Sequence, residues 1–149
     1  MGGTDVRWVS EGLGIYVSRL KHYVPFSMVE IPQLKNVSSW SRERIKDREG
    51  ELLLSRVRAS DELVLLDEKG EMFRSVDFAR FMEKKMNAGR DLTFAVGGAY
   101  GFSDAVYGRA SGKISLSPMT FSHQMVRVIF AEQLYRAFTI MNGEPYHHE

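Results

Sequence analysis

The chain has 149 residues, 44% of them hydrophobic and 26% charged, a composition that predicts one globular domain over residues 1–149. Twenty basic and nineteen acidic side chains give a formal net charge of +1, so no overall field would draw a polyanion to the protein. The sequence has no cysteine, no run of roughly 18 apolar residues to cross a membrane and no secretion-signal layout, so we expect a cytoplasmic protein without disulfides or thiolate metal sites.

Helix-like and strand-like patterns alternate from the start of the chain. Residues 6–23 carry apolar side chains at helical spacing, and Thr4 or Asp5 is the expected N-cap of this helix. Residues 26–31 alternate between apolar and polar and end at Pro32, which predicts a strand.

The alternation continues to the end of the chain. Further helices are predicted from Ser41 onward and over residues 77–86, 105–107 and 122–141, and further strands over residues 62–67, 92–96 and 113–116. Strands that alternate with helices favour an α/β fold, with a mostly parallel sheet covered by helices on both faces. Ligands of such folds bind at the carboxyl ends of the strands.

Three loops at predicted strand ends are unusual. They are LVLLDEKG, which leaves the sheet after Leu66, FAVGGAYGFS, which begins its glycines at Gly97, and ISLSPMTFSH, which precedes the last helix. Glycines after a buried strand let a ligand approach the backbone, although a tight turn is the commoner reason for them. In the third loop, Leu116, Met119 and Phe121 either plug the core or form an apolar slot for a flat ring.

Basic residues are concentrated in the first third of the chain. Arg42, Arg44, Lys46 and Arg48 interleave with acidic residues on one predicted helix. This pattern is more typical of a solvated helix face than of a nucleic-acid site.

The carboxyl-terminal string SPMTFSHQMVRVIFAEQLYRAFTIMNGEPYHHE resembles the signature of the ribosomal RNA large subunit methyltransferase H family. VGGAYG, VLLDEKG and KDREGELLL resemble its other motifs, so the likeness covers nearly the whole chain and is looser before Leu63. The resemblance implies a SPOUT fold with a deep carboxyl-terminal trefoil knot. It also implies a homodimer that uses S-adenosylmethionine to methylate N3 of a pseudouridine in 23S ribosomal RNA, on the large subunit or the assembled ribosome.

The resemblance also implies roles for particular residues and no role for a metal or a membrane. The expected cofactor contacts are Leu66, Gly97, Leu116, Ser117, Pro118, Met119, Thr120 and Phe121. The expected substrate contacts are His123, Arg136 and Tyr146, and the expected catalytic residues are Arg127, His147 and His148. From the residues alone, the two tail histidines could equally be a mobile polar terminus, and Arg136 a surface ion pair with Glu132.

The sequence departs from the family pattern at both ends. Relatives begin with an apolar strand, whereas this sequence starts Met1-Gly2-Gly3-Thr4, so the first strand is expected to be missing. At the tail, His148 replaces the usual Arg or Lys. Methylation of another RNA or of a protein, or a ribosome-binding module that has lost catalysis, are the alternative functions.

Overall fold

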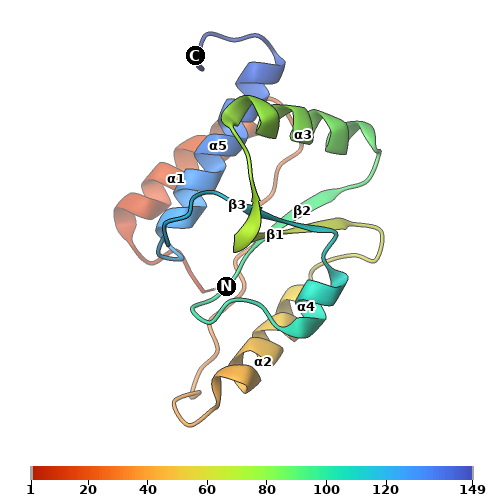
Figure 1. The fold of residues 1–149 in the computed structure, drawn as a ribbon. Coiled ribbons are helices and arrows are strands. Elements are labelled where there is room, and N and C mark those ends of the chain that lie inside the picture. Colours follow the sequence, from red (N-terminus) through yellow and green to blue (C-terminus); the bar gives the residue numbers. More distant parts are fainter. Residues whose placement is uncertain (1, 149) are drawn as a thin grey trace.

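The computed structural model describes residues 2–148 and contains a small parallel sheet with helices on both of its faces (Figure 1). In chain order the elements are α1 (Arg7–Leu20), α2 (Arg42–Leu54), β1 (Glu62–Met72), α3 (Ser75–Asn87), β2 (Leu92–Val96), α4 (Asp104–Arg109), β3 (Gly112–Ser115) and α5 (Met125–Met141). This confirms the predicted α/β class.

The sheet has the strand order β2-β1-β3, and the central strand β1 runs parallel to both neighbours. Leu66 of β1 lies opposite Val96 of β2 and Ile114 of β3. Since all three strands point the same way, the loops that follow them leave from one edge of the sheet.

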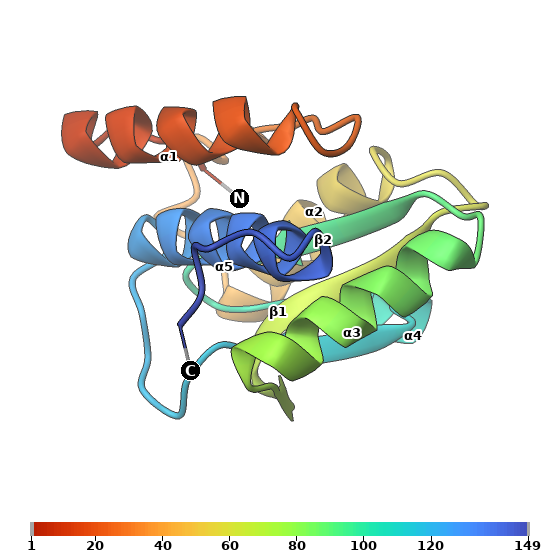
Figure 2. The same cartoon turned by 90° about the horizontal axis from the view of Figure 1, so that it is seen from above.

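The two faces of the sheet are buried against different helices (Figures 1 and 2). Successive side chains of a strand point to opposite faces. Val64 and Ile114 therefore pack with α3 and α5, whereas Leu63 and Leu65 pack with Leu53 of α2 and the residues around α4. Helix α1 lies outside α5 and packs on it (Figure 2).

The helix starts follow the predicted chemistry at α2 but not at α1. Ser41 caps α2, because its Oγ accepts a hydrogen bond from the Arg44 amide at 3.2 Å. The prediction that Thr4 or Asp5 caps α1 is wrong: the N-cap is Val6, without a side-chain cap. The Thr4 hydroxyl is engaged elsewhere, donating to Glu30 and accepting from Arg127.

The predicted strand over residues 26–31 is also wrong, because this segment is extended but pairs with no strand in the described part of the chain. It is linked to the amino-terminal segment by a backbone hydrogen bond of 2.9 Å from the Gly2 amide to the Ile31 carbonyl and by the hydrogen bond from the Thr4 hydroxyl to Glu30. Among residues 2–148 the first regular element is α1, and the missing first strand stays a prediction.

Strand β1 is longer than the apolar run that predicted it. After Leu66 its register against β3 shifts, and Glu71 again lies opposite Ile114. The intervening residues bulge outward and return at Gly70, where an added Cβ would lie 2.5 Å from the Ile114 backbone N and C atoms. Only glycine allows this approach of two backbones.

No helix among the described residues is long and apolar enough to span a membrane.

Substituting Gly70 tests this close approach. We expect Gly70→Ala to lower the free energy of unfolding by more than about 2 kcal/mol, because the backbone of a central sheet position cannot move aside easily. Gly108→Ala is the matched control, since an added Cβ there meets nothing within 4 Å. Urea unfolding of the three proteins measures the difference, and equal stability of Gly70→Ala and wild type would contradict the geometry.

Candidate functional site

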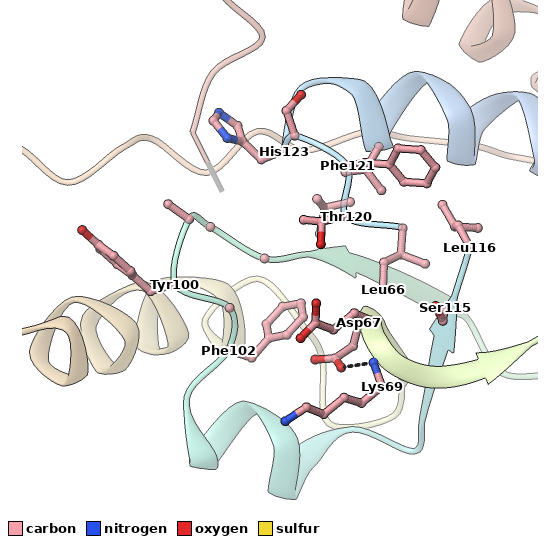
Figure 3. Close-up of a pocket in the computed structure, with 18 of the residues that line it drawn as sticks. Leu66, Asp67, Lys69, Tyr100, Phe102, Ser115, Leu116, Thr120, Phe121 and His123 are labelled. Atoms are coloured by element: carbon pink, nitrogen blue, oxygen red, sulfur yellow. Dashed lines mark hydrogen bonds between the residues drawn. The ribbon is translucent and has the colours of Figure 1, made fainter. Parts of the chain in front are cut away.

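The bulge of β1 and the loops that follow β2 and β3 meet around one pocket with a volume of about 820 Å³ (Figure 3). This volume lies within the range of small-molecule sites. Of the eight predicted cofactor contacts, seven line it: Leu66, Gly97, Leu116, Ser117, Met119, Thr120 and Phe121. Pro118 does not line the pocket, although both of its neighbours do. His123, predicted as a substrate contact, also lines it.

The structure adds residues to the pocket that sequence reasoning did not assign to it. They include Arg42, Lys46, Asp67, Lys69, Tyr100 and Ser115. Arg42 and Lys46 lie four positions apart on α2, so they share one face of the helix. That spacing was visible in the sequence, but only the packing of α2 shows which way the face points.

The loop between β3 and α5 is shaped by two serine side chains. The Ser115 hydroxyl donates to the Ser117 carbonyl at 3.0 Å, and the Ser117 hydroxyl accepts from the Met119 amide at 2.9 Å. The loop leaves Met119 78% exposed and Phe121 36% exposed. Met119 and Phe121 therefore do not plug the core and support the alternative of an apolar slot, whereas Leu116 packs against the core and also lines the pocket.

The glycine loop after β2 is a tight turn that also borders the pocket. The Gly101 amide donates to the Gly98 carbonyl at 3.1 Å, and Gly101 has a φ of +78°, which favours glycine. A Cβ added to Gly98 would lie only 2.4 Å from a carboxylate oxygen of Glu49. Burial raises the pKa of Glu49 above its usual value.

Asp67 lies at the start of the β1 bulge and connects this part of the pocket to α4 through a hydrogen bond. One carboxylate oxygen accepts from the Tyr107 hydroxyl at 2.5 Å. The other accepts from the Lys69 amide at 2.8 Å (Figure 3). Burial, together with the hydrogen bond to Asp67, raises the pKa of Tyr107 to about 12. The protonated phenol is therefore the stable form at neutral pH.

A second polar cluster forms where the tail folds back on α5. Arg136 donates to Glu132 at 2.5 Å, and the Tyr146 hydroxyl donates to the same carboxylate oxygen at 3.1 Å. The Arg136 guanidinium lies 4.8 Å from the Tyr146 ring centroid, and Nδ1 of His147 is 3.4 Å from Nη1 of Arg136. Burial, followed by hydrogen bonds to Tyr16 and Glu132, raises the pKa of Tyr146.

This tail cluster lies apart from the pocket of its own chain. None of its described members lines the pocket, and exposed His148 does not line it either. Arg136 is eleven residues beyond Met125, at the start of α5, which corresponds to about 16 Å along a helix. The predicted substrate contacts are therefore divided, with His123 at the pocket and Arg136 and Tyr146 in the tail cluster.

Arg127 also lies outside the residues that line the pocket. It is only 5% exposed, and its guanidinium donates to the Gly2 carbonyl at 2.8 Å and the Thr4 hydroxyl at 2.7 Å. These contacts hold the amino-terminal segment against α5. Its catalytic role stays a prediction.

No group of three or more His, Asp or Glu side chains among residues 2–148 is arranged to hold a metal ion.

Comparisons with known proteins agree on one group of enzymes. Residues 1–147 match the family described as predicted SPOUT methyltransferase. A ribosomal RNA large subunit methyltransferase H from Parabacteroides distasonis is 55% identical over 100% of this chain and 96% of its own length. A protein of the same name from Flavobacterium johnsoniae is 51% identical over 100% of this chain and 96% of its own length. Another, from Bacteroides fragilis, is 56% identical over 90% of this chain and 86% of its own length.

The hydrogen bond between Tyr107 and Asp67 predicts a pH-dependent stability. Because the folded-state pKa is raised, the contribution of the hydroxyl is complete below the unfolded value of 10.0 and is lost as the pH rises through about 12. We expect Tyr107→Phe to cost about 1 kcal/mol of unfolding free energy at neutral pH.

Urea unfolding of wild type and Tyr107→Phe between pH 7 and pH 11 measures this effect. The difference between them should be constant below pH 10 and shrink above it. Tyr100→Phe, at an exposed tyrosine, is the control for the substitution itself. A difference that is absent at pH 7, or that grows at high pH, would contradict the assignment.

Proposed function

The chain belongs to the SPOUT methyltransferase family, and from this we propose that it methylates N3 of a pseudouridine in 23S ribosomal RNA, using S-adenosylmethionine. The proposed setting is the cytoplasm, with the large subunit or the assembled ribosome as the substrate. The observation that carries the proposal is the pocket in which the bulge of β1 and the loops after β2 and β3 converge.

The lining of this pocket fits S-adenosylmethionine. Leu66, Leu116 and Phe121 offer apolar surface to an adenine ring, and the loops supply backbone groups for its polar edge. Ser117 and Thr120 add hydroxyl groups for the sugar and amino-acid parts. When bound, this cofactor supplies a methyl group on a positively charged sulfur, which a nitrogen nucleophile can accept without a metal.

The protein has to orient the base and accept one proton. Methylation forms an N–C bond at N3 and breaks the N3–H bond, while negative charge develops on the two flanking carbonyls. We assign proton acceptance to His147, with His148 as the alternative, since imidazole is the side chain that most often serves as a general base. Arg136, beside His147, can stabilise the charge on a carbonyl oxygen, and Arg127 is the second candidate for that role.

The separation of pocket and tail cluster supports a site shared between two copies of the chain. Within one chain, the pocket lies at the start of α5, whereas the tail residues lie near the other end of this helix. Trp8 is 56% and Ile15 is 52% exposed on α1, which gives this helix apolar surface that a second copy of the chain would bury. In the proposed homodimer, one subunit holds the cofactor and its mate contributes Arg136, Tyr146 and His147.

A deep trefoil knot at the carboxyl end is part of the same proposal. Its support is the SPOUT family membership.

Two measurements test the function. Calorimetry should detect binding of S-adenosylmethionine and of its demethylated product. Labelled methyl groups should enter 23S RNA of intact ribosomes, and not transfer RNA or protein. Binding without transfer would indicate a module that has lost catalysis, transfer to another acceptor would change the substrate, and no cofactor binding would refute the proposal.

Complementation tests the shared site. Phe121→Asp should abolish cofactor binding by placing a charge in the apolar slot, and His147→Ala should abolish transfer while leaving cofactor binding intact. In a purified heterodimer of the two variants, one site carries both defects and the other carries neither. Activity should return to about half of the wild-type rate, and an inactive heterodimer would contradict shared sites.

A further inference from the structure

A group of basic and aromatic side chains borders the pocket on the side away from the apolar slot. Arg42 and Lys46 of α2 line the pocket, together with Tyr100 of the glycine loop, and we call these three residues the α2 rim. In Figure 3, Tyr100 lies at the opposite side of the pocket from Leu116. Tyr100 therefore lies away from the Leu116 side of the apolar slot.

The side chains of the rim are available for contacts with a ligand. Tyr100 is 47% exposed, and the Arg42 guanidinium lies 5.6 Å from its ring centroid. Lys46 has no ion-pair or hydrogen-bond partner within residues 2–148. Glu43 also lines this wall, so the helix contributes two cations and one anion to the pocket.

The other basic residues of α2 have different roles. Arg44 lies over the Trp40 ring at 4.0 Å, and Arg48 pairs with Glu51 at 2.5 Å. Neither residue lines the pocket. The interpretation of the basic run as a solvated helix face therefore fits Arg44 and Arg48, but not Arg42 and Lys46.

Building on the proposed function, we propose that the α2 rim is an RNA-contacting surface, with Arg42 and Lys46 on backbone phosphates and Tyr100 stacked on a base next to the target nucleotide. Cations that follow the backbone, combined with an exposed aromatic ring, are the usual means of holding a single-stranded segment. A protein with a formal net charge of +1 needs such a local group, because it has no overall field to hold a polyanion. The position beside the pocket would bring the bound strand to the cofactor.

Charge-neutralising variants test the phosphate contacts. In Arg42→Gln/Lys46→Gln, affinity for a short synthetic RNA hairpin with pseudouridine in its loop should fall about tenfold or more at moderate salt. The slope of log affinity against log salt, measured by fluorescence anisotropy between about 50 and 200 mM, should decrease by about 1.5. Arg48→Gln is the matched control, with one charge removed from the same helix outside the pocket, and should change both quantities much less.

Tyr100→Leu tests stacking without changing the charge. It should weaken RNA binding roughly tenfold and leave the salt slope unchanged. Thermal unfolding of every variant confirms that the fold is retained, and Arg42→Gln and Lys46→Gln as single variants replace the double variant if it unfolds.

Cofactor calorimetry on the same variants separates the rim from the cofactor site. Wild-type affinity for the demethylated cofactor is expected in all of them. If the variants bind RNA as tightly as wild type does, and wild type methylates ribosomes, the proposed RNA contacts of the rim are wrong and the proposed function stands. Loss of cofactor affinity with unchanged RNA affinity would reassign the rim to the cofactor. A wild-type protein that methylates ribosomes but does not bind the hairpin would overturn the rim alone, and one that neither binds the hairpin nor methylates ribosomes would overturn both proposals.

Discussion

The structure depends on one strand, β1, which pairs in parallel with a neighbour on each side. This pairing gives all three strands the same direction, so the bulge of β1 and the loops after β2 and β3 lie at one edge of the sheet and enclose the pocket. The bulge after Leu66 keeps β1 in contact with β3 and brings Gly70 against the Ile114 backbone. A side chain at Gly70 would push β3 away, and the loop that follows β3 carries most of the apolar slot.

The same arrangement explains why the functional residues fall into two groups. A loop at a strand end can reach the pocket of its own chain, whereas the end of α5 points away from it. Glu132, Arg136 and Tyr146 bind one another instead, in a cluster held by a shared carboxylate oxygen. A cluster of charged and aromatic groups at a distance from its own pocket is what a site completed by a second subunit would look like, and the exposed apolar residues of α1 agree with a dimer.

Much of this could be predicted from the sequence, and the exceptions have physical reasons. The strand over residues 92–96 and the helix start at Ser41 were predictable, because apolar runs and capping residues act locally. The segment over residues 26–31 has the pattern of a strand but no neighbouring strand, and pairing cannot be read from one segment. The pocket loops could be located by the strand-end rule, whereas the direction in which Arg42 and Lys46 point depends on how α2 packs. The family resemblance supplied the residue roles in the tail, which no local pattern distinguishes from a surface ion pair.

The central claim is that the bulge of β1 and the loops after β2 and β3 form a single cofactor site. The most direct measurement is the change in backbone amide NMR shifts of the labelled protein on titration with the demethylated cofactor. The account predicts that the largest shifts fall together on residues 66–70, 97–101 and 116–123, with one common dissociation constant. Shifts confined to one of these loops, or centred on the smaller hollow between Lys69, Tyr107 and Lys113, would contradict it.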